Sequence, residues 1–355
     1  MSKRRLTYIT HVDWGHIRQR PHHFACGLAS GFDVTVVSPV ARGSRVKVAN
    51  PAPGIRSVRL LRAPGSYRSA TVFAVNNALC AAELRALMPK KPDVVLVTAP
   101  ECYAWLASRL QDCFVIYDCM DDALAFAQDD GVRRAKATLE RALLQRADLV
   151  VATSDALRDR CIARGAAEAR VRVIGNGWDS SAFPVAPSSA LPASGPVTLT
   201  YFGTIDTWLD VPALARMLDA APFASLDMIG PNASSLVATH PRMRLHSPVR
   251  HADLATAVAR SDAMILPFLV DDLIRAVDPV KLYEYVALGK PIVSSYWPAL
   301  APFAPFVTFY RDASELASLV AERALPEPPP ASHRAAFLGS RSWQARIDEL
   351  AAEIA

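Results

Sequence analysis

The chain has 355 residues, which exceeds the roughly 250–300 residues at which single hydrophobic cores stop growing, so two domains are expected. With 51% apolar and 21% charged residues the composition is that of an ordinary globular protein, and no apolar run approaches the roughly 18 residues of a membrane span. The net charge is +5, but residues 1–186 carry 26 Lys/Arg against 17 Asp/Glu, whereas the remainder carries 13 against 17.

The basic excess is concentrated between Val34 and Ala82, a stretch without any acidic residue. Such a stretch suits an anionic membrane surface or a phosphorylated substrate, and a merely solvated basic face is the alternative. Nucleic acid is disfavoured, because neither an aromatic-interleaved basic groove nor a known nucleic-acid motif accompanies it. The basic residues of this stretch are Arg42, Arg45, Lys47, Arg56, Arg59, Arg62 and Arg68.

The six cysteines lie in the first half without a C-x-x-C pair or regular spacing, which argues against a disulfide framework or a structural zinc site. The apolar segment behind the basic N-terminus is too short for a signal peptide. We therefore expect buried or incidental thiols and a cytoplasmic protein.

Short apolar runs alternate with helical patterns along the first half of the chain. One helix is predicted with Pro21 near its start and Gly31 just past its end, and another over residues 155–164. Continuous apolar strands that alternate with helices predict a parallel sheet covered on both faces. The predicted strands are residues 6–10, 33–39, 94–99, 113–118 and 147–154.

A stretch rich in Pro, Ser and Ala, residues 184–196, separates this half from a second α/β pattern and predicts a linker. We divide the chain into a first domain (1–183), the linker, a second domain (197–330) and a C-terminal helix (331–355, with its core near 332–353). In the second domain we predict strands at 197–203, 225–230, 243–248, 263–268 and 291–295, with helices after Asp210, over 252–260 and over 280–288.

The segment DPVKLYEYVALGKP, residues 278–291, predicts the last of these helices, with Asp278 as N-cap, Pro279 at the first helical position and Gly289 as C-terminal cap. Apolar side chains surround almost the whole helix, and only Lys281 and Glu284 interrupt them. These two charges form either a narrow solvated ion pair or a pair that faces a ligand.

Ligands of doubly wound sheets bind outside the carboxyl ends of the strands. This rule places Gly203, Thr204, Pro267 and the start of the 280–288 helix on one wall of a cleft. The opposite wall then contains His11, Asp13, Asp118 and Asp121. Neither wall carries G-x-G-x-x-G or a P-loop, which disfavours a nicotinamide dehydrogenase.

Four segments in order resemble the GT-B glycosyltransferases, in particular the glycosyltransferase family 4 group of bacterial surface-polysaccharide synthesis. The segments are VDWGHIRQRPHHFACGLA, VIYDCMDD, ADLVVATSDALRDR followed by VRVIGNGWDSSAF, and DPVKLYEYVALGKPIVSS. The resemblance implies two Rossmann-like domains that face a central cleft, with a C-terminal helix that crosses back to the first domain. It also implies a nucleotide-sugar co-substrate (UDP- or GDP-linked) and no bound cofactor or metal.

On the donor side the resemblance implies that Glu284 accepts hydrogen bonds from the two ribose hydroxyls and that Lys281 contacts the diphosphate, near a helix N-terminus. Two departures leave retention or inversion open. Ala276 stands where retaining members have Glu, so that Asp278, Asp272 or backbone N–H groups would hold the sugar, and the loop 203–210 has neither Arg nor Lys. The expected donor side is Glu284, Lys281, Arg275, Asp278, Gly203, Thr204 and Val249.

On the acceptor side the resemblance implies an Asp at a strand end as general base, for which Asp121 and Asp118 are the candidates and a polar turn or helix cap is the alternative. His11 is a candidate for a hydrogen bond to substrate. Asp13, Trp14 and Arg20 complete the expected acceptor side, and Trp14 either stacks on a sugar or anchors its loop. A metal site among His11, His16, His22 and His23 is disfavoured, because no acidic or cysteine partner has ligand spacing.

The leading hypothesis is a glycosyltransferase that moves a sugar from a nucleotide-sugar to a lipid-linked or saccharide acceptor, in cell-surface polysaccharide synthesis. We expect a cytoplasmic protein that lies peripherally at the inner face of an anionic membrane. We expect no nucleic acid among its partners. The alternatives are a non-catalytic paralogue that binds nucleotide or a partner enzyme, and a sugar-nucleotide epimerase.

Overall fold

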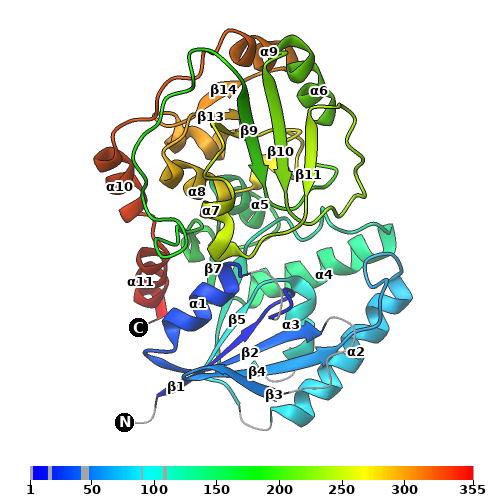
Figure 1. Cartoon of the computed structure of the whole chain (residues 1–355). Coiled ribbons are helices and arrows are strands. Elements are labelled where there is room, and N and C mark those ends of the chain that lie inside the picture. The colour runs from blue at the N-terminus through cyan, green and yellow to red at the C-terminus, as the bar shows by residue number, and fades with distance from the viewer. Residues whose placement is uncertain (1–2, 15–17, 41–47, 89–90, 107–109, 355) are drawn as a thin grey trace. The chain divides into compact units, whose positions relative to one another are not determined.

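The computed structural model describes residues 3–14, 18–40, 48–88, 91–106 and 110–354 (Figure 1). The chain divides into two compact units. The first unit comprises Met1–Gly175 together with Arg346–Ala355, and the second comprises Asn176–Ala345.

The first unit is built on an eight-stranded sheet of order β3-β4-β2-β1-β5-β6-β7-β8. Neighbouring strands are parallel except β3 and β4, which form an antiparallel pair. All residues of β5 and β7 are buried, as expected for a parallel sheet covered on both faces. The strands are β1 (Arg4–Ile9), β2 (Phe32–Val40), β3 (Val48–Ala52), β4 (Ile55–Leu61), β5 (Val94–Val97), β6 (Phe114–Cys119), β7 (Leu149–Ala152) and β8 (Val171–Val173).

Three of the first unit's helices begin at a side-chain N-cap. Ser69, Asp129 and Ser154 accept hydrogen bonds from the backbone N–H three residues ahead, which satisfies a donor that the helix leaves free. Helices α2, α3 and α4 pack against one another. The helices are α1 (Arg20–Leu28), α2 (Ala70–Leu87), α3 (Pro100–Leu106), α4 (Asp130–Arg146), α5 (Asp155–Ala163) and the short η2 (Glu168–Arg170).

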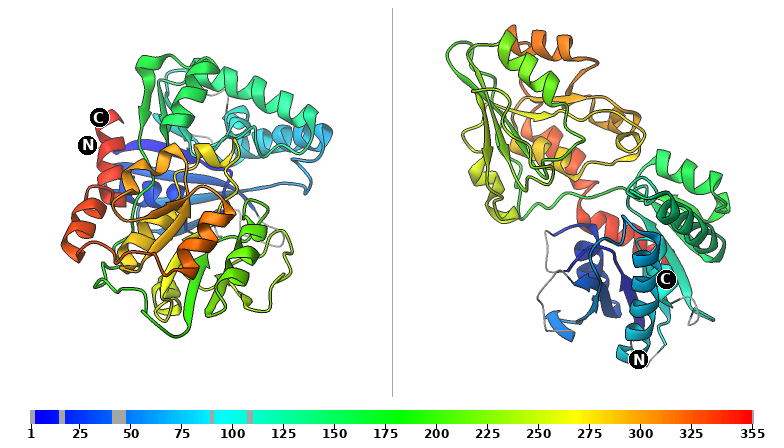
Figure 2. Two further views of the ribbon diagram at one scale, coloured as in Figure 1. Left: turned by 90° about the horizontal axis from the view of Figure 1, so that it is seen from above. Right: turned by 90° about the vertical axis from the view of Figure 1, so that its right-hand side faces the viewer.

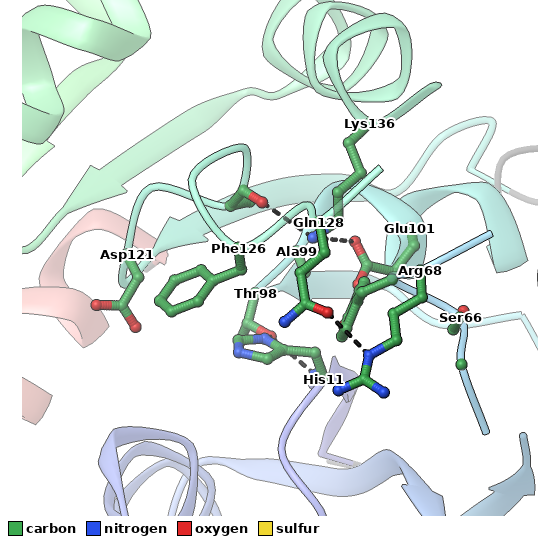
Figure 3. A pocket seen from close by; sticks show the side chains of 13 residues that line it. His11, Ser66, Arg68, Thr98, Ala99, Glu101, Asp121, Phe126, Gln128 and Lys136 are labelled. Atoms are coloured by element: carbon green, nitrogen blue, oxygen red, sulfur yellow. Dashed lines mark hydrogen bonds and ion pairs between the residues drawn. The ribbon is translucent and has the colours of Figure 1, made fainter. Parts of the chain in front are cut away.

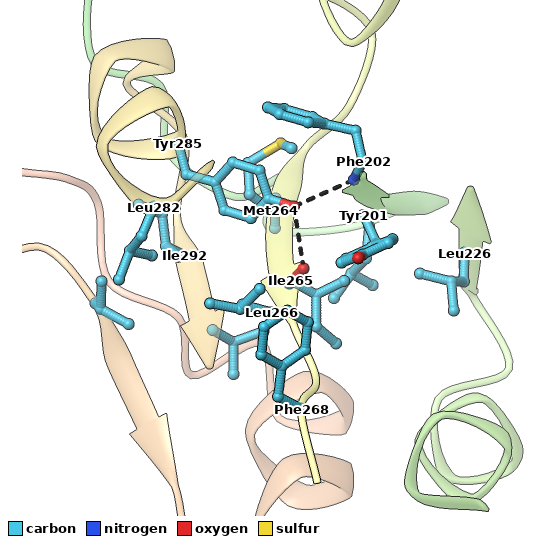
Figure 4. Packing of buried hydrophobic residues seen from close by; sticks show 14 of the residues in the cluster. Tyr201, Phe202, Leu226, Met264, Ile265, Leu266, Phe268, Leu282, Tyr285 and Ile292 are labelled. Atoms are coloured by element: carbon cyan, nitrogen blue, oxygen red, sulfur yellow. Dashed lines mark hydrogen bonds between the residues drawn. The ribbon is translucent and has the colours of Figure 1, made fainter. Parts of the chain in front are cut away.

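The second unit has a six-stranded, all-parallel sheet of order β11-β10-β9-β12-β13-β14. Its core surrounds β12, where the Tyr285 hydroxyl lies 3.2 Å from the backbone nitrogen of Phe202 and 3.4 Å from the Ile265 carbonyl oxygen (Figure 4). The strands are β9 (Val197–Phe202), β10 (Ala224–Ile229), β11 (Met243–His246), β12 (Ala263–Leu266), β13 (Ile292–Ser295) and β14 (Thr308–Tyr310).

Along the chain the helices of the second unit alternate with these strands, and α6 and α9 run side by side (Figures 1 and 2). Where one helix is predicted over 252–260, the structure has η3 and the four-residue α7. The helices are α6 (Val211–Ala220), η3 (His251–Asp253), α7 (Leu254–Ala257), η4 (Ile274–Ala276), α8 (Val280–Leu288), η5 (Pro298–Phe303), α9 (Ala313–Ala321), α10 (Ala331–Gly339) and α11 (Trp343–Ile354).

The boundary between the units lies at 175/176, so the predicted linker 184–196 belongs to the second unit. Trp178 and Phe183, which precede the linker, are part of that unit's core. The buried guanidinium of Arg334, on α10, donates to the carbonyl oxygens of Ala186 and Val286. This side chain therefore ties the linker to α8.

The single C-terminal helix predicted from the sequence is wrong, because the structure has two helices, α10 and α11, with a break between them. At the break, Trp178 exchanges backbone hydrogen bonds with Arg341 and Trp343 (2.8 and 3.1 Å) in place of helical ones. The last ten residues belong to the first unit, where Arg4 donates to the carbonyl oxygen of Ile354 (2.9 Å).

No helix among the described residues is long and apolar enough to cross a membrane.

Candidate functional site

The first unit contains a pocket of about 500 Å³ at the carboxyl ends of β1, β5 and β6 (Figure 3). This is the edge at which doubly wound sheets bind their ligands. Figure 3 shows Asp121 on one side of the pocket and Glu101 with Lys136 on the other. The lining residues are His11, Gly65, Ser66, Tyr67, Arg68, Thr98, Ala99, Glu101, Asp121, Ala123, Phe126, Gln128 and Lys136.

Asp121 follows β6 by two residues and is half-buried in the pocket wall. Desolvation, with the nearby carboxylates of Asp122 and Asp118, raises the pKa of Asp121 from 3.8 to about 7, against the opposing charge of Arg20. In the described part of the chain, no group donates a hydrogen bond to this carboxylate. A carboxylate in this state is suited to accept a proton at neutral pH.

His11 lines the same pocket, two residues after β1. Its Nδ1 lies 2.9 Å from the hydroxyl of Thr98, which also accepts a hydrogen bond from the His11 backbone (3.1 Å). Burial lowers the pKa of His11, so the ring is neutral at pH 7. The structure therefore brings His11 and Asp121 together, as the strand-end rule predicts.

Glu101 and Lys136 are pocket residues that the sequence analysis missed. Glu101, on α3, is fully buried, and its Oε1 accepts a hydrogen bond from the Tyr67 hydroxyl (2.7 Å). Lys136, on α4, is 2% exposed, and its Nζ lies 3.6 Å from Glu101 Oε2. Glu101 follows β5 by four residues, so the strand-end rule applied to that strand would have indicated it.

Asp118, the other candidate base, is buried and is not among the residues that line the pocket. Its Oδ1 accepts from Arg20 Nε (2.9 Å) and its Oδ2 from the Tyr8 hydroxyl (2.7 Å). The other side of the Arg20 guanidinium donates to the carbonyl oxygen of Gly175 (2.8 Å). Arg20 and Asp118 thus form a buried ion pair in the interior of the first unit.

Asp13 and Trp14 are likewise absent from the pocket lining, although both are described. The Trp14 ring stacks on His22 with centroids 4.2 Å apart, and His22 Nε2 lies 3.2 Å from the Trp14 carbonyl oxygen. This contact matches the loop-anchor alternative for Trp14. His22 and His23 lie on α1, and His16 lies outside the described residues.

Part of the basic stretch, Arg42, Arg45 and Lys47, lies outside the described residues. Of the other four, only Arg68 is exposed, and its Nε donates to Gln128 (2.9 Å).

Arg62 is half-buried, donates to the Ser66 hydroxyl (2.9 Å) and lies over the rings of Tyr67 and Trp105. Arg56 donates to the Leu87 carbonyl oxygen (3.1 Å) and is also half-buried. Arg56 and Arg62 therefore do not fit the alternative of a merely solvated basic face.

In the second unit, Glu284 is 5% exposed on α8, which overturns the alternative of a solvated stripe. Its Oε1 lies 2.6 Å from Nε2 of His251, at the start of η3, and no sequence pattern indicated this partner. Burial raises the pKa of Glu284, while the hydrogen bond and charge of His251 and the charge of Lys281 oppose the shift. The ring of Phe183 lies 5.3 Å from that of His251 and helps to fix its position.

Lys281 lies beside the loop that follows β9. Its Nζ is 3.4 Å from the Tyr201 hydroxyl and lies over the rings of Tyr201 and Phe268, 5.2 and 5.0 Å from their centroids. A Cβ on Gly203, whose φ is +132°, would come within 2.8 Å of Lys281 Nζ. Gly203 therefore leaves room for the ammonium group next to the half-buried Thr204.

Three further expected donor residues occupy different environments. Asp278 is buried and accepts hydrogen bonds from the Asn176 backbone (2.5 Å) and the Tyr283 hydroxyl (3.0 Å). Its prediction as helix N-cap is wrong, because Pro279 holds that position and Asp278 instead fixes the turn at Asn176. Gly289 is the C-terminal cap as predicted, with φ +67°. Arg275 is exposed, and Val249 packs against the second unit's core.

No group of three or more His, Cys, Asp or Glu side chains in the described residues could hold a metal ion. Five of the six cysteines are buried, and Cys26 is exposed.

Comparison with known proteins identifies relatives of both the sequence and the fold. Residues 17–177 match the family model described as "Glycosyl transferase 4-like domain". Over 216 residues, 55% of this chain and 54% of the relative, the chain is 26% identical to the "putative teichuronic acid biosynthesis glycosyltransferase TuaH" of Bacillus subtilis (strain 168). The chain thus spans about half the length of this curated relative.

Solved structures that match nearly the whole chain include the following two. A sucrose-phosphate synthase from Thermosynechococcus elongatus gives a TM-score of 0.77 at 16% identity and covers 99% of this chain and 98% of its own. An E. coli structure described as trehalose-6-phosphate bound with UDP-2-fluoro glucose gives 0.73 at 11% identity, with 98% of each chain covered. Identities this low show the fold alone, and the GT-B expectation is confirmed.

Proposed function

We propose that this chain, whose residues 17–177 match the model of a glycosyl transferase 4-like domain and whose fold is GT-B, transfers a sugar from a nucleotide-sugar donor to a hydroxyl of a lipid-linked or saccharide acceptor in surface-polysaccharide synthesis. The observation that carries the proposal is Asp121, a pocket carboxylate to which none of the described residues donates a hydrogen bond and whose pKa is raised to about 7. The teichuronic acid relative supports the polysaccharide role.

In this proposal the second unit binds the donor. Glu284 accepts hydrogen bonds from the ribose hydroxyls, since its two oxygens match a cis-diol, and Lys281 offsets charge on the leaving diphosphate. The first turn of α8, which begins at Val280, adds backbone N–H groups near the phosphates. Arg275, exposed on η4, is a second cation for the leaving group.

The first unit holds the acceptor in its pocket, where Asp121 accepts the proton of the attacking hydroxyl. His11, as a neutral ring, forms a hydrogen bond to the same sugar. Asp118 and Arg20 act one step removed from substrate, because Arg20 lowers the pKa of Asp121 and Asp118, to a smaller extent, raises it.

The test begins with the donor. Thermal unfolding of the wild-type protein is followed with UDP, GDP, ADP and CMP, because a ligand at 100 times its Kd adds about 2.7 kcal/mol of stability. Sugars linked to the stabilising nucleotide are then assayed for transfer and hydrolysis. Stabilisation without either reaction would favour a non-catalytic binding protein, and conversion of the donor sugar without acceptor would favour an epimerase.

A lipid-linked acceptor requires contact with a membrane, and we propose that α2 provides it. The side chains of Val75 and Leu79 on this helix are exposed (51% and 56%). Leu61, the last residue of β4, is also exposed, and its backbone N–H donates to Glu83 of α2. Arg68, just before the helix, is exposed beside the pocket. Apolar side chains with basic neighbours suit an anionic bilayer.

The membrane proposal is tested by sedimentation with vesicles of phosphatidylcholine that contain phosphatidylglycerol. The double change Val75→Asp with Leu79→Asp should weaken binding at least tenfold. The matched control is Val237→Asp, since Val237 is 76% exposed in the second unit. Unchanged vesicle binding would refute the role of α2, and so would a loss of self-association instead of vesicle binding.

A further inference from the structure

Two buried, oppositely charged side chains line the pocket on the side away from Asp121 (Figure 3). Both are fixed in place. The Tyr67 hydroxyl donates to Glu101 Oε1 (2.7 Å), and Lys136 Nζ donates to the Ala123 carbonyl oxygen (3.0 Å). Lys136 Nζ also lies 4.5 Å from the centroid of the Tyr67 ring. Their remaining hydrogen-bonding capacity is therefore presented in a defined geometry.

The remaining capacity consists of one hydrogen-bond acceptor, an oxygen of Glu101, beside the N–H donors of the Lys136 ammonium group. Glu101 Oε2 is buried and has no hydrogen-bond partner among the described residues, and the 3.6 Å from it to Lys136 Nζ is an ion-pair distance that exceeds hydrogen-bond length. An ammonium group has three N–H donors, of which Lys136 gives one to Ala123. A ligand group that donates a hydrogen bond to Glu101 Oε2 and accepts one from Lys136 Nζ would use the free hydrogen-bonding capacity of both side chains.

We infer that Glu101 and Lys136 together bind one hydroxyl group of a neutral saccharide acceptor, an inference that rests on the acceptor role proposed for this pocket. A hydroxyl donates and accepts at once, so it satisfies both side chains. A phosphate or carboxylate only accepts hydrogen bonds, and it would face the charges of Glu101 and Asp121. An amine that is protonated only donates, and it would face Lys136. The site therefore selects an uncharged alcohol.

This assignment separates two roles within one pocket. Glu101 is unsuited to be the base, because the charge of Lys136 and the hydrogen bond from Tyr67 outweigh burial and hold the pKa of Glu101 below its usual range. Asp121, on the other side, retains the proton affinity for that step. The Glu101–Lys136 pair fixes a hydroxyl that does not react, and Asp121 deprotonates the one that does. Any anionic part of the acceptor would have to lie at the exposed Arg68.

The first experiment uses the wild-type protein and needs no variant to fold. Methyl glycosides of glucose, galactose, mannose and N-acetylglucosamine are tested for binding by saturation-transfer NMR, and monodeoxy analogues of the tightest binder follow. We expect one deoxy position to weaken binding about 10- to 100-fold, as for loss of a hydrogen bond to a charged group. The 6-phosphate of the same sugar should bind no more tightly. Absence of glycoside binding, or equal losses at every position, would overturn the inference.

The second experiment tests whether that hydroxyl is bound by Glu101 and Lys136. Glu101→Gln keeps an oxygen for Tyr67 and places an NH₂ group where Oε2 lies, so the hydroxyl meets two donors and no acceptor. The parent glycoside should then bind 10- to 100-fold more weakly, with no further loss for the deoxy analogue. Lys136→Met is the second variant, and exposed Glu168→Gln is the matched control. A deoxy loss of wild-type size in both pocket variants would show that the pair is only structural.

Failure of this inference is distinguishable from failure of the proposed function. If nucleotide-sugar transfer proceeds and Glu101→Gln leaves the acceptor KM unchanged, the inference falls and the function stands. If the deoxy pattern appears but no nucleotide-sugar is ever consumed, the hydroxyl site stands and the function falls. Nucleotide binding by the second unit should be equal in wild-type and Glu101→Gln protein.

Discussion

Replacement of Asp121 by Asn tests the proposed base in two independent ways. The variant removes a proton acceptor, so the transfer rate should fall about 10²- to 10⁴-fold while nucleotide binding stays unchanged. It also removes a carboxylate that is costly to ionise in its folded surroundings. The same substitution should therefore lower activity and raise the stability of the folded protein at alkaline pH.

The size of the stability gain follows from the shift in pKa. A rise from 3.8 to about 7 is roughly 3 units, and each unit corresponds to about 1.4 kcal/mol, which gives an upper limit of about 4 kcal/mol. Asp121 is half-buried, so solvent screening reduces the expected gain to about 1–3 kcal/mol.

The sign follows from the protons bound in each state. Because the folded state holds the proton of Asp121 more tightly than the unfolded state does, wild-type stability decreases between about pH 4 and pH 7 and then levels off. The advantage of Asp121→Asn should be smallest near pH 4.5 and should reach its full size by pH 8. In wild-type enzyme the transfer rate should increase about tenfold per pH unit below pH 7.

The assay is thermal unfolding of wild-type and variant protein at pH 4.5 and pH 8, alongside transfer rates from pH 5.5 to 8.5. Asp33→Asn, a change of an exposed carboxylate on β2, controls for the loss of one charge. A stability difference that is the same at both pH values would refute the pKa of about 7. A pH–rate profile that stays flat through pH 7 would exclude Asp121 as the base.

Three further predictions concern the second unit. Glu284→Gln should weaken nucleotide binding about 10- to 100-fold in the thermal-shift assay, whereas the exposed control Glu327→Gln should not; equal shifts would exclude Glu284 from the nucleotide site. Arg334→Ala should destabilise this unit to denaturant by at least about 3 kcal/mol, because buried carbonyl oxygens lose a charged donor, and an effect no larger than that of exposed Arg260→Ala would contradict this. Gly230→Ala should lower the free energy of unfolding by about 2–4 kcal/mol, because Gly230 has φ +149° and an added Cβ would collide with the Gly203 carbonyl. Gly339→Ala is the control, since its Cβ would meet open space. Similar melting temperatures for the two variants would refute the collision.

Much of the fold could be predicted because its strands are buried on both faces. Runs such as VVLV and LVVA carry that burial in their own composition, so β5 and β7 are recognised without tertiary information. The break before α11 could not be predicted in this way. It depends on backbone bonds from Trp178 to Arg341 and Trp343, residues far apart in the chain.

In the candidate site, too, some residues could be predicted from the sequence and others depend on tertiary packing. Asp121 and His11 were found because each follows a strand, and strand ends of a parallel sheet lie at one edge. Lys136 lies in the middle of α4, where a lysine is typical of a solvated helix face. Only the packing of α4 against α3 buries it beside Glu101.

The separation of Asp118 from Asp121 shows how the fold assigns different roles to similar residues. Both are aspartates at or beyond the end of β6, and from the sequence both are candidates for the base, with Asp121 named first. Asp118 lies on the strand, where Arg20 and Tyr8 occupy both of its oxygens. Three residues later the chain has left the sheet, and Asp121 reaches the pocket without such partners. Burial and the charge of Asp122 raise its proton affinity most, and Arg20 opposes that rise by more than Asp118 adds to it, so Asp121 holds its proton affinity in spite of the buried ion pair.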